Sequence, residues 1–322
     1  MKELKGKNYI CSNEGTINND SIGWSRNVFK NCDIETGFFR KKIWNHYMWM
    51  NEKFICTFAL VKLDYIGLIY VDFYDIRKDN EIHKSIYIPL CNGMIIHNNI
   101  GSYAHFQNKQ MYANIIRVSN SLNVILKWDE IDIDVSIDIE DESLNVLVPW
   151  SDKLFHYTSK QFPLKSSGYI QIGEEQCYIE ESMAFIDYGR GIWEREKSWY
   201  WLTCGFEKDD KRIGLNLGAK WTDNTGVNEN CIKINDTIVK INSDVEFNKI
   251  DEENWSIKSI DSNEVDLVFN MINLNEKLSN KYIVKSDMKQ RVGRLSGIVK
   301  LNDEDIEFES VICWFEDHYA KW

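Results

Sequence analysis

Hydrophobic and polar residues alternate with a period of two along most of the chain. In the segment 131–139 every second residue is aliphatic, and three aspartates and a serine lie between them. This pattern is typical of a β-strand with one dry and one wet face, because successive side chains of a strand point to opposite sides. Short polar turns separate the similar runs at 54–60, 66–74, 84–89, 111–118, 122–128, 169–172, 198–206, 213–220, 231–234, 264–271, 294–301 and 306–315.

So many short strands at hairpin spacing indicate antiparallel sheet. The best helix candidates, 43–49 and 310–322, fit a strand equally well. Antiparallel sheets of this size often close into barrels, which removes exposed strand edges. We therefore expect an all-β fold of two antiparallel β-barrel or sandwich domains packed together. A segment with proline, serine and glycine at 163–168 divides the strands into domains 1–165 and 166–322.

Composition narrows the range of partners. The 322 residues carry 38 Lys and Arg against 50 Asp and Glu, a net charge of −12. Nucleic acids and anionic membranes are bound through clusters of Lys and Arg, so we expect neither as a partner. No apolar stretch is long enough for a spanning helix, and the charged N-terminus resembles no export signal. We therefore expect a cytoplasmic protein without membrane insertion, with its eight cysteines reduced.

Several familiar chemistries lack their sequence signatures. There is no Gly-x-Ser-x-Gly elbow, no phosphate-binding loop and no dinucleotide fingerprint. The six histidines show no spacing typical of metal ligands. We therefore expect no cofactor and no metal ion.

Four segments break the alternation by crowding bulky, polar and glycine residues together. In the first, 22–26 and 40–44, tryptophans adjoin arginines and lysines, which favours either cation–π stacking or a solvated strap. In the second, 148–152 and 157–161, Pro149 marks a strand end or bulge because it cannot donate to a ladder. This second segment is either a polar turn or part of a ligand site. Its candidate ligand-binding residues are Trp150, Asp152, Tyr157 and Lys160.

The third segment, 185–193 with its continuation to 201, is the strongest pocket candidate. Gly189 and Gly191 permit a positive φ or a close backbone approach around Arg190. If the chain stays extended, Glu194 and Glu196 share a face at a Cα separation of roughly 6.5–7 Å. The segment forms either an acidic pocket with an aromatic wall or a sheet core with a charged rim. Its candidate ligand-binding residues are Arg190, Trp193, Glu194, Trp199 and Trp201.

The fourth segment, 214–226, continues to an acidic residue at Glu229. Polar residues alternate along it, and its last four residues have the composition of a turn. The turn is either structural or part of a polar site. Its candidates are Asn216, Lys220, Trp221, Asp223 and Glu229.

Taken in this order, the four segments resemble the bacterial domain of unknown function 2804 family, with 143–152 and 157–161 as the nearest match. Tyr200 stands where the family leads us to expect Asn, and 273–289 departs from the pattern. The resemblance implies one shared architecture, similar to lipocalin-like double-barrel proteins of the carotenoid-hydratase type. The matching stretches are 22–26, 40–44, 144–161, 185–193, 214–226 and 314–322.

A first functional hypothesis is an acid/base enzyme of the hydratase, cyclase or isomerase type acting on an apolar small molecule. A carboxylic acid in a dry site can protonate an alkene, and tryptophan faces stabilise the cation that forms. The acid would be Asp187 or Asp223, followed by Glu229, and Arg190 would set its ionisation or hold a polar ligand head. The tryptophans lining the site would be Trp193, Trp199, Trp201 and Trp221.

Two other classes fit the same residues. A carbohydrate-active protein would stack sugars on tryptophan and use a carboxylate pair, Glu194 with Asp223 or Glu229. A non-catalytic barrel would hold one small ligand in an apolar lumen. All three hypotheses share a small-molecule partner, either apolar or a sugar.

Overall fold

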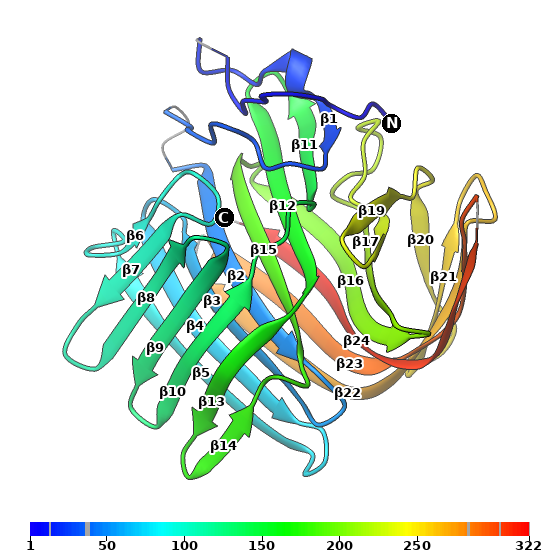
Figure 1. Cartoon of the computed structure of the whole chain (residues 1–322). Helices are drawn as coiled ribbons and strands as arrows, with labels where there is room; N and C mark the ends of the chain where they lie inside the picture. Colours follow the sequence, from blue (N-terminus) through cyan, green and yellow to red (C-terminus); the bar gives the residue numbers. More distant parts are fainter. Residues whose placement is uncertain (13, 36–38, 282–283, 303, 322) are drawn as a thin grey trace. The chain divides into compact units, whose positions relative to one another are not determined.

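The computed structural model describes residues 1–12, 14–35, 39–281, 284–302 and 304–321. These residues form 24 β-strands and one 3₁₀ turn, η1 (Asn19–Ser21), and Figure 1 shows sheet throughout. Every described strand pairing within the three sheets is antiparallel, which confirms the predicted all-β antiparallel fold. No helix among the described residues has the length and hydropathy needed to cross a bilayer.

The chain forms two compact units, an N-terminal unit of Lys2–Trp193 and a C-terminal unit of Met1 with Glu194–Trp322. The sequence-based limits assign the segment 166–193 to the C-terminal domain, whereas in the structure it belongs to the N-terminal unit. This segment forms three strands that pair with strands of the N-terminal unit. The two helix candidates are strand, and Trp322 at the end of the second lies outside the described residues.

The N-terminal unit contains two sheets. The 8-stranded sheet has the order β1-β11-β12-β15-β2-β3-β4-β5, and the 7-stranded sheet has the order β14-β13-β10-β9-β8-β7-β6. Their strands are β1 (Gly23–Ser25), β2 (Lys41–Met50), β3 (Phe54–Lys62), β4 (Ile66–Asp75), β5 (Asn80–Pro89), β6 (Ile95–Ile96), β7 (Tyr103–Gln107), β8 (Met111–Val118), β9 (Ser121–Trp128), β10 (Ile131–Asp138), β11 (Leu144–Ser151), β12 (Leu154–Leu164), β13 (Ser166–Ile172), β14 (Glu175–Tyr178) and β15 (Met183–Ile192).

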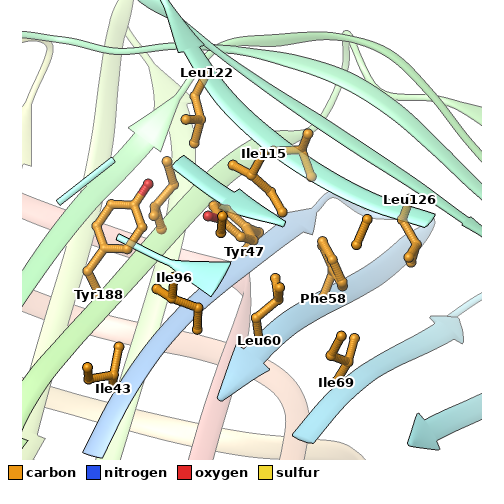
Figure 2. Close-up of a cluster of buried hydrophobic side chains, with 14 of the residues drawn as sticks. Ile43, Tyr47, Phe58, Leu60, Ile69, Ile96, Ile115, Leu122, Leu126 and Tyr188 are labelled. Carbon is orange, nitrogen blue, oxygen red and sulfur yellow. The ribbon is translucent and has the colours of Figure 1, made fainter. Parts of the chain in front are cut away.

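The core of the N-terminal unit lies between these sheets. Figure 2 shows Tyr47 and Phe58 of the 8-stranded sheet in one cluster with Ile115 and Leu126 of the 7-stranded sheet, and all four are buried. Each fully buried side chain of this size contributes about 1.5–3 kcal/mol through removal from water. The alternating aliphatic residues of 131–139 belong to this cluster, which is why that segment carried the clearest pattern.

The opposite face of the 8-stranded sheet is chemically different. Core side chains recur at alternate positions in parts of β2, β12 and β15, so the positions between them point away from the core. Several of those positions carry polar or charged side chains that are nevertheless buried. They include Lys42, His46, His156, Thr158, Lys160 and Asp187.

The C-terminal unit is one 9-stranded sheet with the order β19-β18-β17-β16-β24-β23-β22-β21-β20. The sheet curls so strongly that the edge strand β20 approaches β17 (Figure 1). Leu202, Phe269 and Phe315 are among its fully buried residues. Its strands are β16 (Glu196–Lys208), β17 (Lys211–Ala219), β18 (Cys231–Ile234), β19 (Thr237–Lys240), β20 (Val245–Lys249), β21 (Asn254–Ser259), β22 (Val265–Lys281), β23 (Val284–Lys300) and β24 (Asp305–Lys321).

Candidate functional site

A buried ion pair lies on the polar face of the 8-stranded sheet. Asp187 on β15 and Lys160 on β12 are directly opposite in register, and Lys160 Nζ is 3.1 Å from Asp187 Oδ2. Trp44 Nε1 donates to the same oxygen at 3.1 Å, and Thr158 Oγ1 donates to Oδ1 at 3.2 Å. A buried carboxylate needs such partners, because desolvation otherwise penalises its charge heavily. The sequence nominated Asp187 and Lys160 separately, and the structure brings them together.

Aromatic rings adjoin this carboxylate. Trp44 stacks on His156 with ring centroids 4.6 Å apart. Trp193 meets Trp44 and His156 edge-on at 5.6 Å and 4.9 Å, and Trp150 lies 4.9 Å from Trp193. Trp150, half-buried, and Trp193 were predicted from the sequence, whereas Trp44 was interpreted as a cation–π partner or part of a solvated strap and His156 was passed over. We call Trp44, Trp150, His156, Thr158, Lys160, Asp187 and Trp193 the Asp187 cluster.

His156 is a neutral ring in this cluster. Burial lowers its pKa well below the usual value, and the positive charges of Lys160 and Arg190 lower it further. Trp193 Nε1 donates to His156 Nδ1 at 3.1 Å, so Nδ1 carries no proton and Nε2–H is the donor. The cluster therefore contains a carboxylate, an ammonium group and a neutral imidazole with a defined tautomer.

Two glycines of β15 make room for the rings. A Cβ on Gly189 would lie 2.1 Å from Trp44 Cε2, and one on Gly191 would lie 2.9 Å from His156 Nδ1. Neither residue is among those with a positive φ. Of the two roles expected for these glycines, a positive φ and a close approach, the structure shows the close approach. The groups that come close include the rings of Trp44 and His156.

Arg190 has a structural role on the opposite face of the 8-stranded sheet. Residue 190 is three positions from Asp187 along an extended strand, so its side chain points to the other side of the sheet. The Arg190 guanidinium donates to the Asn45 side chain and to the carbonyls of Asn98, Trp44, Gly189 and His97. Arg190 was expected to set the ionisation of the acid or to hold a polar ligand head, whereas the cation beside the Asp187 carboxylate is Lys160.

Tyr157 and Asp152 also stand apart from the cluster. Tyr157 Oη donates to Asn145 Oδ1 at 2.8 Å and accepts the Phe29 N–H at 3.0 Å. Asp152 is exposed between β11 and β12, and the pairing of these strands shifts at Pro149, as a bulge there requires. The second segment is therefore divided, because Trp150 and Lys160 join the cluster and the other two residues do not.

A second buried group lies in the C-terminal unit around Glu229. Trp221 Nε1 donates to Glu229 Oε1 at 2.8 Å, Asn216 Nδ2 donates to the Glu229 carbonyl at 2.7 Å, and Trp201 Nε1 donates to Asn216 Oδ1 at 2.7 Å. A Cβ on Gly218 would lie 2.0 Å from Glu229 Oε1. This arrangement fixes the glutamate by packing and hydrogen bonds.

The remaining candidates of the C-terminal unit occupy more exposed positions. Asp223 is exposed and its Oδ1 accepts the Lys220 N–H at 2.8 Å, so it stabilises the predicted turn. The chain bends at Arg195, which breaks the extended path assumed for Glu194 and Glu196. Glu194 pairs with Lys197 at 2.7 Å.

Trp199 contacts a histidine and a glutamate that were not nominated. Its Nε1 donates to Glu316 Oε1 at 2.7 Å, and its ring centroid is 4.1 Å from that of His318. Glu316 and His318 lie two positions apart on β24, so they share one face of this strand, which pairs with β16. The signal in the sequence was the acidic and histidine residues directly after the apolar run 311–315, and polar residues likewise interrupt the bulky residues of β2 around Trp44.

The chain belongs to the family described as Domain of unknown function (DUF2804), which matches residues 1–322. Solved structures with a similar fold include kievitone hydratase from Nectria haematococca, 11% identical, with a TM-score of 0.53 over 87% of this chain and 88% of that chain. They also include CghA with Sch210972, 8% identical, with a TM-score of 0.53 over 87% and 88%. No curated protein matches the chain by sequence. At these identities the likeness shows the fold, in agreement with the lipocalin-like double-barrel resemblance.

Proposed function

We propose that the chain is an acid/base enzyme of the hydratase, cyclase or isomerase type that acts on a largely apolar small molecule, with Asp187 as its proton-transfer group. The observation that carries this proposal is the buried Asp187–Lys160 pair, 3.1 Å apart, with tryptophan rings beside it. Proton-transfer groups in enzymes are typically buried titratable groups with a specific charge partner.

The pair can hold a proton in two places. With the proton on Lys160 the pair is a carboxylate and an ammonium, and with the proton on Asp187 Oδ2 it is a carboxylic acid and an amine. The acid form donates its proton to an alkene carbon and leaves a carbocation. The faces of Trp44, Trp150 and Trp193 stabilise that cation through their ring quadrupoles.

The second half of the reaction restores the proton. Addition of water, attack by a second double bond of the substrate, or loss of a neighbouring C–H proton completes a hydration, a cyclisation or an isomerisation respectively. In each case one proton leaves the substrate or the added water and returns to Asp187 Oδ2. Thr158 and Trp44 hold the carboxylate in position throughout, because each donates to one of its oxygens.

The structural neighbours support the same class by analogy. Their names include a hydratase, and the other protein was crystallised with the small molecule Sch210972. One fold can host many reactions, so the residues of the Asp187 cluster carry the argument. His156 would contribute a neutral Nε2–H donor for a polar group of the substrate.

The test compares the wild-type chain with Asp187→Asn by untargeted mass spectrometry of small-molecule extracts incubated in H₂O and D₂O. We expect the wild type to produce a compound heavier by one water, or isomeric with its precursor, and to incorporate solvent deuterium. Asp187→Asn should slow this conversion by about 100-fold or more, the usual contribution of a general acid/base. Lys53→Met, which removes an exposed ion pair with Glu181, is the control and should be as active as the wild type.

Two results would overturn the proposal. Unchanged turnover in Asp187→Asn would remove the assigned group. Native mass spectrometry that finds a ligand bound to wild type but never converted would instead establish a non-catalytic binder.

A further inference from the structure

Four aromatic rings of the C-terminal unit contact one another on one face of its sheet. Tyr200 on β16 lies 5.1 Å from Phe247 on β20 and 5.8 Å from Trp255 on β21, measured between ring centroids. Phe315 on β24 lies 5.1–5.7 Å from all three. None of these residues was nominated as a site residue from the sequence, and none belongs to the Asp187 cluster.

A buried arginine lies against these rings. Arg291 on β23 is directly opposite Phe315 in register, and its guanidinium carbon is 5.2 Å from the Phe315 centroid and 5.1 Å from that of Trp255. Arg291 is 6% exposed, and burial lowers its pKa. Its one hydrogen bond to a described residue runs from Nη1 to the Lys289 carbonyl at 3.5 Å, the limit for such a bond.

This environment is unusual for a guanidinium. The group has five N–H donors in a planar fork that matches a carboxylate, and buried arginines are normally paired. Among the described residues no carboxylate lies within ion-pair distance of Arg291, and Asp317 and Glu276 act on it only at longer range. Stacking on the rings occupies the faces of the guanidinium and leaves its in-plane donors for another partner.

A second cation lies at the same cluster. Lys220 Nζ is 3.5 Å from the Tyr200 ring centroid and 3.4 Å from Asp317 Oδ1. Glu276, the other carboxylate that acts on Arg291, pairs with Lys289 at 3.5 Å. Arg291, Lys220 and Asp317 therefore leave an excess of one positive charge beside the aromatic surface. The Lys220 side chain is 36% exposed, so a ligand can reach this side of the cluster from solvent.

We propose that Arg291 and Lys220 form a second ligand site, which binds the carboxylate of a small, flat aromatic acid while its ring packs on Tyr200 and Trp255. A monocarboxylate balances the excess charge, and the Arg291 fork accepts it through paired N–H···O bonds. The site lies within the C-terminal unit and is independent of the chemistry proposed for Asp187.

Isothermal titration calorimetry with 2-naphthoate tests the proposal, and 2-naphthamide, which has the same ring without the charge, is the matched ligand. We expect 2-naphthoate to bind the full chain, and 2-naphthamide to bind at least about tenfold more weakly, the usual effect of losing charge-assisted hydrogen bonds. Binding of 2-naphthoate should also weaken as salt is raised. Absence of 2-naphthoate binding, or equal binding of the amide, would overturn the site.

Variants locate the site. Arg291→Met should weaken 2-naphthoate binding by about 10–100-fold, and Arg291→Lys, which keeps the charge without the fork, should weaken it by a smaller factor. Lys220→Met should reduce the affinity and its salt dependence. Lys258→Met removes a half-exposed lysine that pairs with Asp266 and should change nothing.

The two proposals fail separately. Asp187→Asn should bind 2-naphthoate as the wild type does, and Arg291→Lys should keep the turnover assigned to Asp187. If Arg291→Met does not fold, two measurements still decide the question. One compares 2-naphthoate with 2-naphthamide on the wild type, and the other measures 2-naphthoate binding to Arg291→Lys. Equal affinity of all variants would place the acid elsewhere and overturn the proposal.

Discussion

The Asp187 cluster in the N-terminal unit handles its buried cation differently from two buried cations of the C-terminal unit, Arg291 and Lys240. In the N-terminal unit Lys160 faces a carboxylate at 3.1 Å, whose remaining lone pairs accept from Trp44 and Thr158. In the C-terminal unit Arg291 contacts aromatic faces, and Lys240 donates to Asn228 Oδ1 and to the carbonyls of Asn230 and Ile241. The first arrangement is an internally neutral acid–base pair, and the second leaves its cations without a bonded counter-charge.

This difference separates two uses of a buried charge. A matched pair can exchange a proton internally, which suits chemistry on a neutral substrate. An unmatched cation gains most from an anion that arrives from outside, which suits binding. The desolvation cost is large in both cases, so a fold retains such groups only with specific compensation.

The largest expected effect is on stability when the matched pair is broken. Lys160→Met leaves the Asp187 carboxylate buried without its ammonium and should destabilise the chain by about 3–5 kcal/mol. Asp187→Asn/Lys160→Met removes both charges, so it should be more stable than Lys160→Met alone. Urea unfolding measures both values.

The control for this prediction is an exposed pair. Lys53→Met separates Lys53 from Glu181, both largely solvent-exposed, and should cost less than about 1 kcal/mol. A cost for Lys160→Met as small as that of Lys53→Met would show that the Asp187–Lys160 pair is no more than a surface interaction, and the contrast between the units would disappear.

The sequence predicts most strands because half-buried strands alternate in polarity. The segments 111–118 and 231–234 coincide with β8 and β18, and 131–139 differs from β10 by one residue. β2, β12 and β15 were harder to recognise because they are buried on both faces, so burial does not alternate along them. The residues of the Asp187 cluster therefore lie mainly in strands that the alternation of polar and apolar residues predicts least well.

Several residues of the Asp187 cluster were nominated from the sequence, but their contacts were not predicted. Asp187, Lys160 and Trp193 were nominated, and Arg190 was expected to set the ionisation of an acid or to hold a polar ligand head. The parity of an extended strand places the Arg190 side chain on the face opposite Asp187. The contacts of Trp44 with His156 and Asp187 join three strands whose order in the sheet is not encoded locally. Likewise, Arg291 gave no local signal, because its rings come from β21 and β24.

A second test asks whether the position of Trp44 is fixed by Gly189. Gly189→Ala would place a methyl group 2.1 Å from the indole and force the ring away from Asp187. We expect a loss of about 1–3 kcal/mol in the free energy of unfolding, the usual cost of overpacking, together with reduced turnover. The matched control is Gly67→Ala, whose methyl would meet the flexible end of Met94 at 3.1 Å and should cost less.

Gly218 extends this test to the other unit. Gly218→Ala would collide with the Glu229 carboxylate and should destabilise the chain by a similar amount while leaving turnover at Asp187 unchanged. Equal losses of turnover in Gly189→Ala and Gly218→Ala would contradict the assignment of chemistry to the Asp187 cluster.

The smallest expected effect is a pH dependence that arises from Lys240. Burial lowers the pKa of Lys240 to about 7, whereas an unfolded chain holds a lysine near its ordinary value of about 10.4. Between these values the unfolded state binds one proton more than the folded state, so stability should rise as the pH rises from 7. Below pH 7 Lys240 is protonated in both states and contributes no slope.

Unfolding of the wild type and Lys240→Met at pH 7 and pH 8 measures this contribution. Between pH 7 and pH 8 the free energy of unfolding of the wild type should rise by up to about 1.4 kcal/mol more than that of the variant. The reason is that folding releases one proton from Lys240 in this range. The difference in slope is informative even if Lys240→Met is less stable at every pH, since lost hydrogen bonds shift both values together. Parallel slopes would mean that Lys240 stays charged in the folded chain, and that the amide and carbonyl oxygens around it compensate a buried cation as well as a carboxylate does.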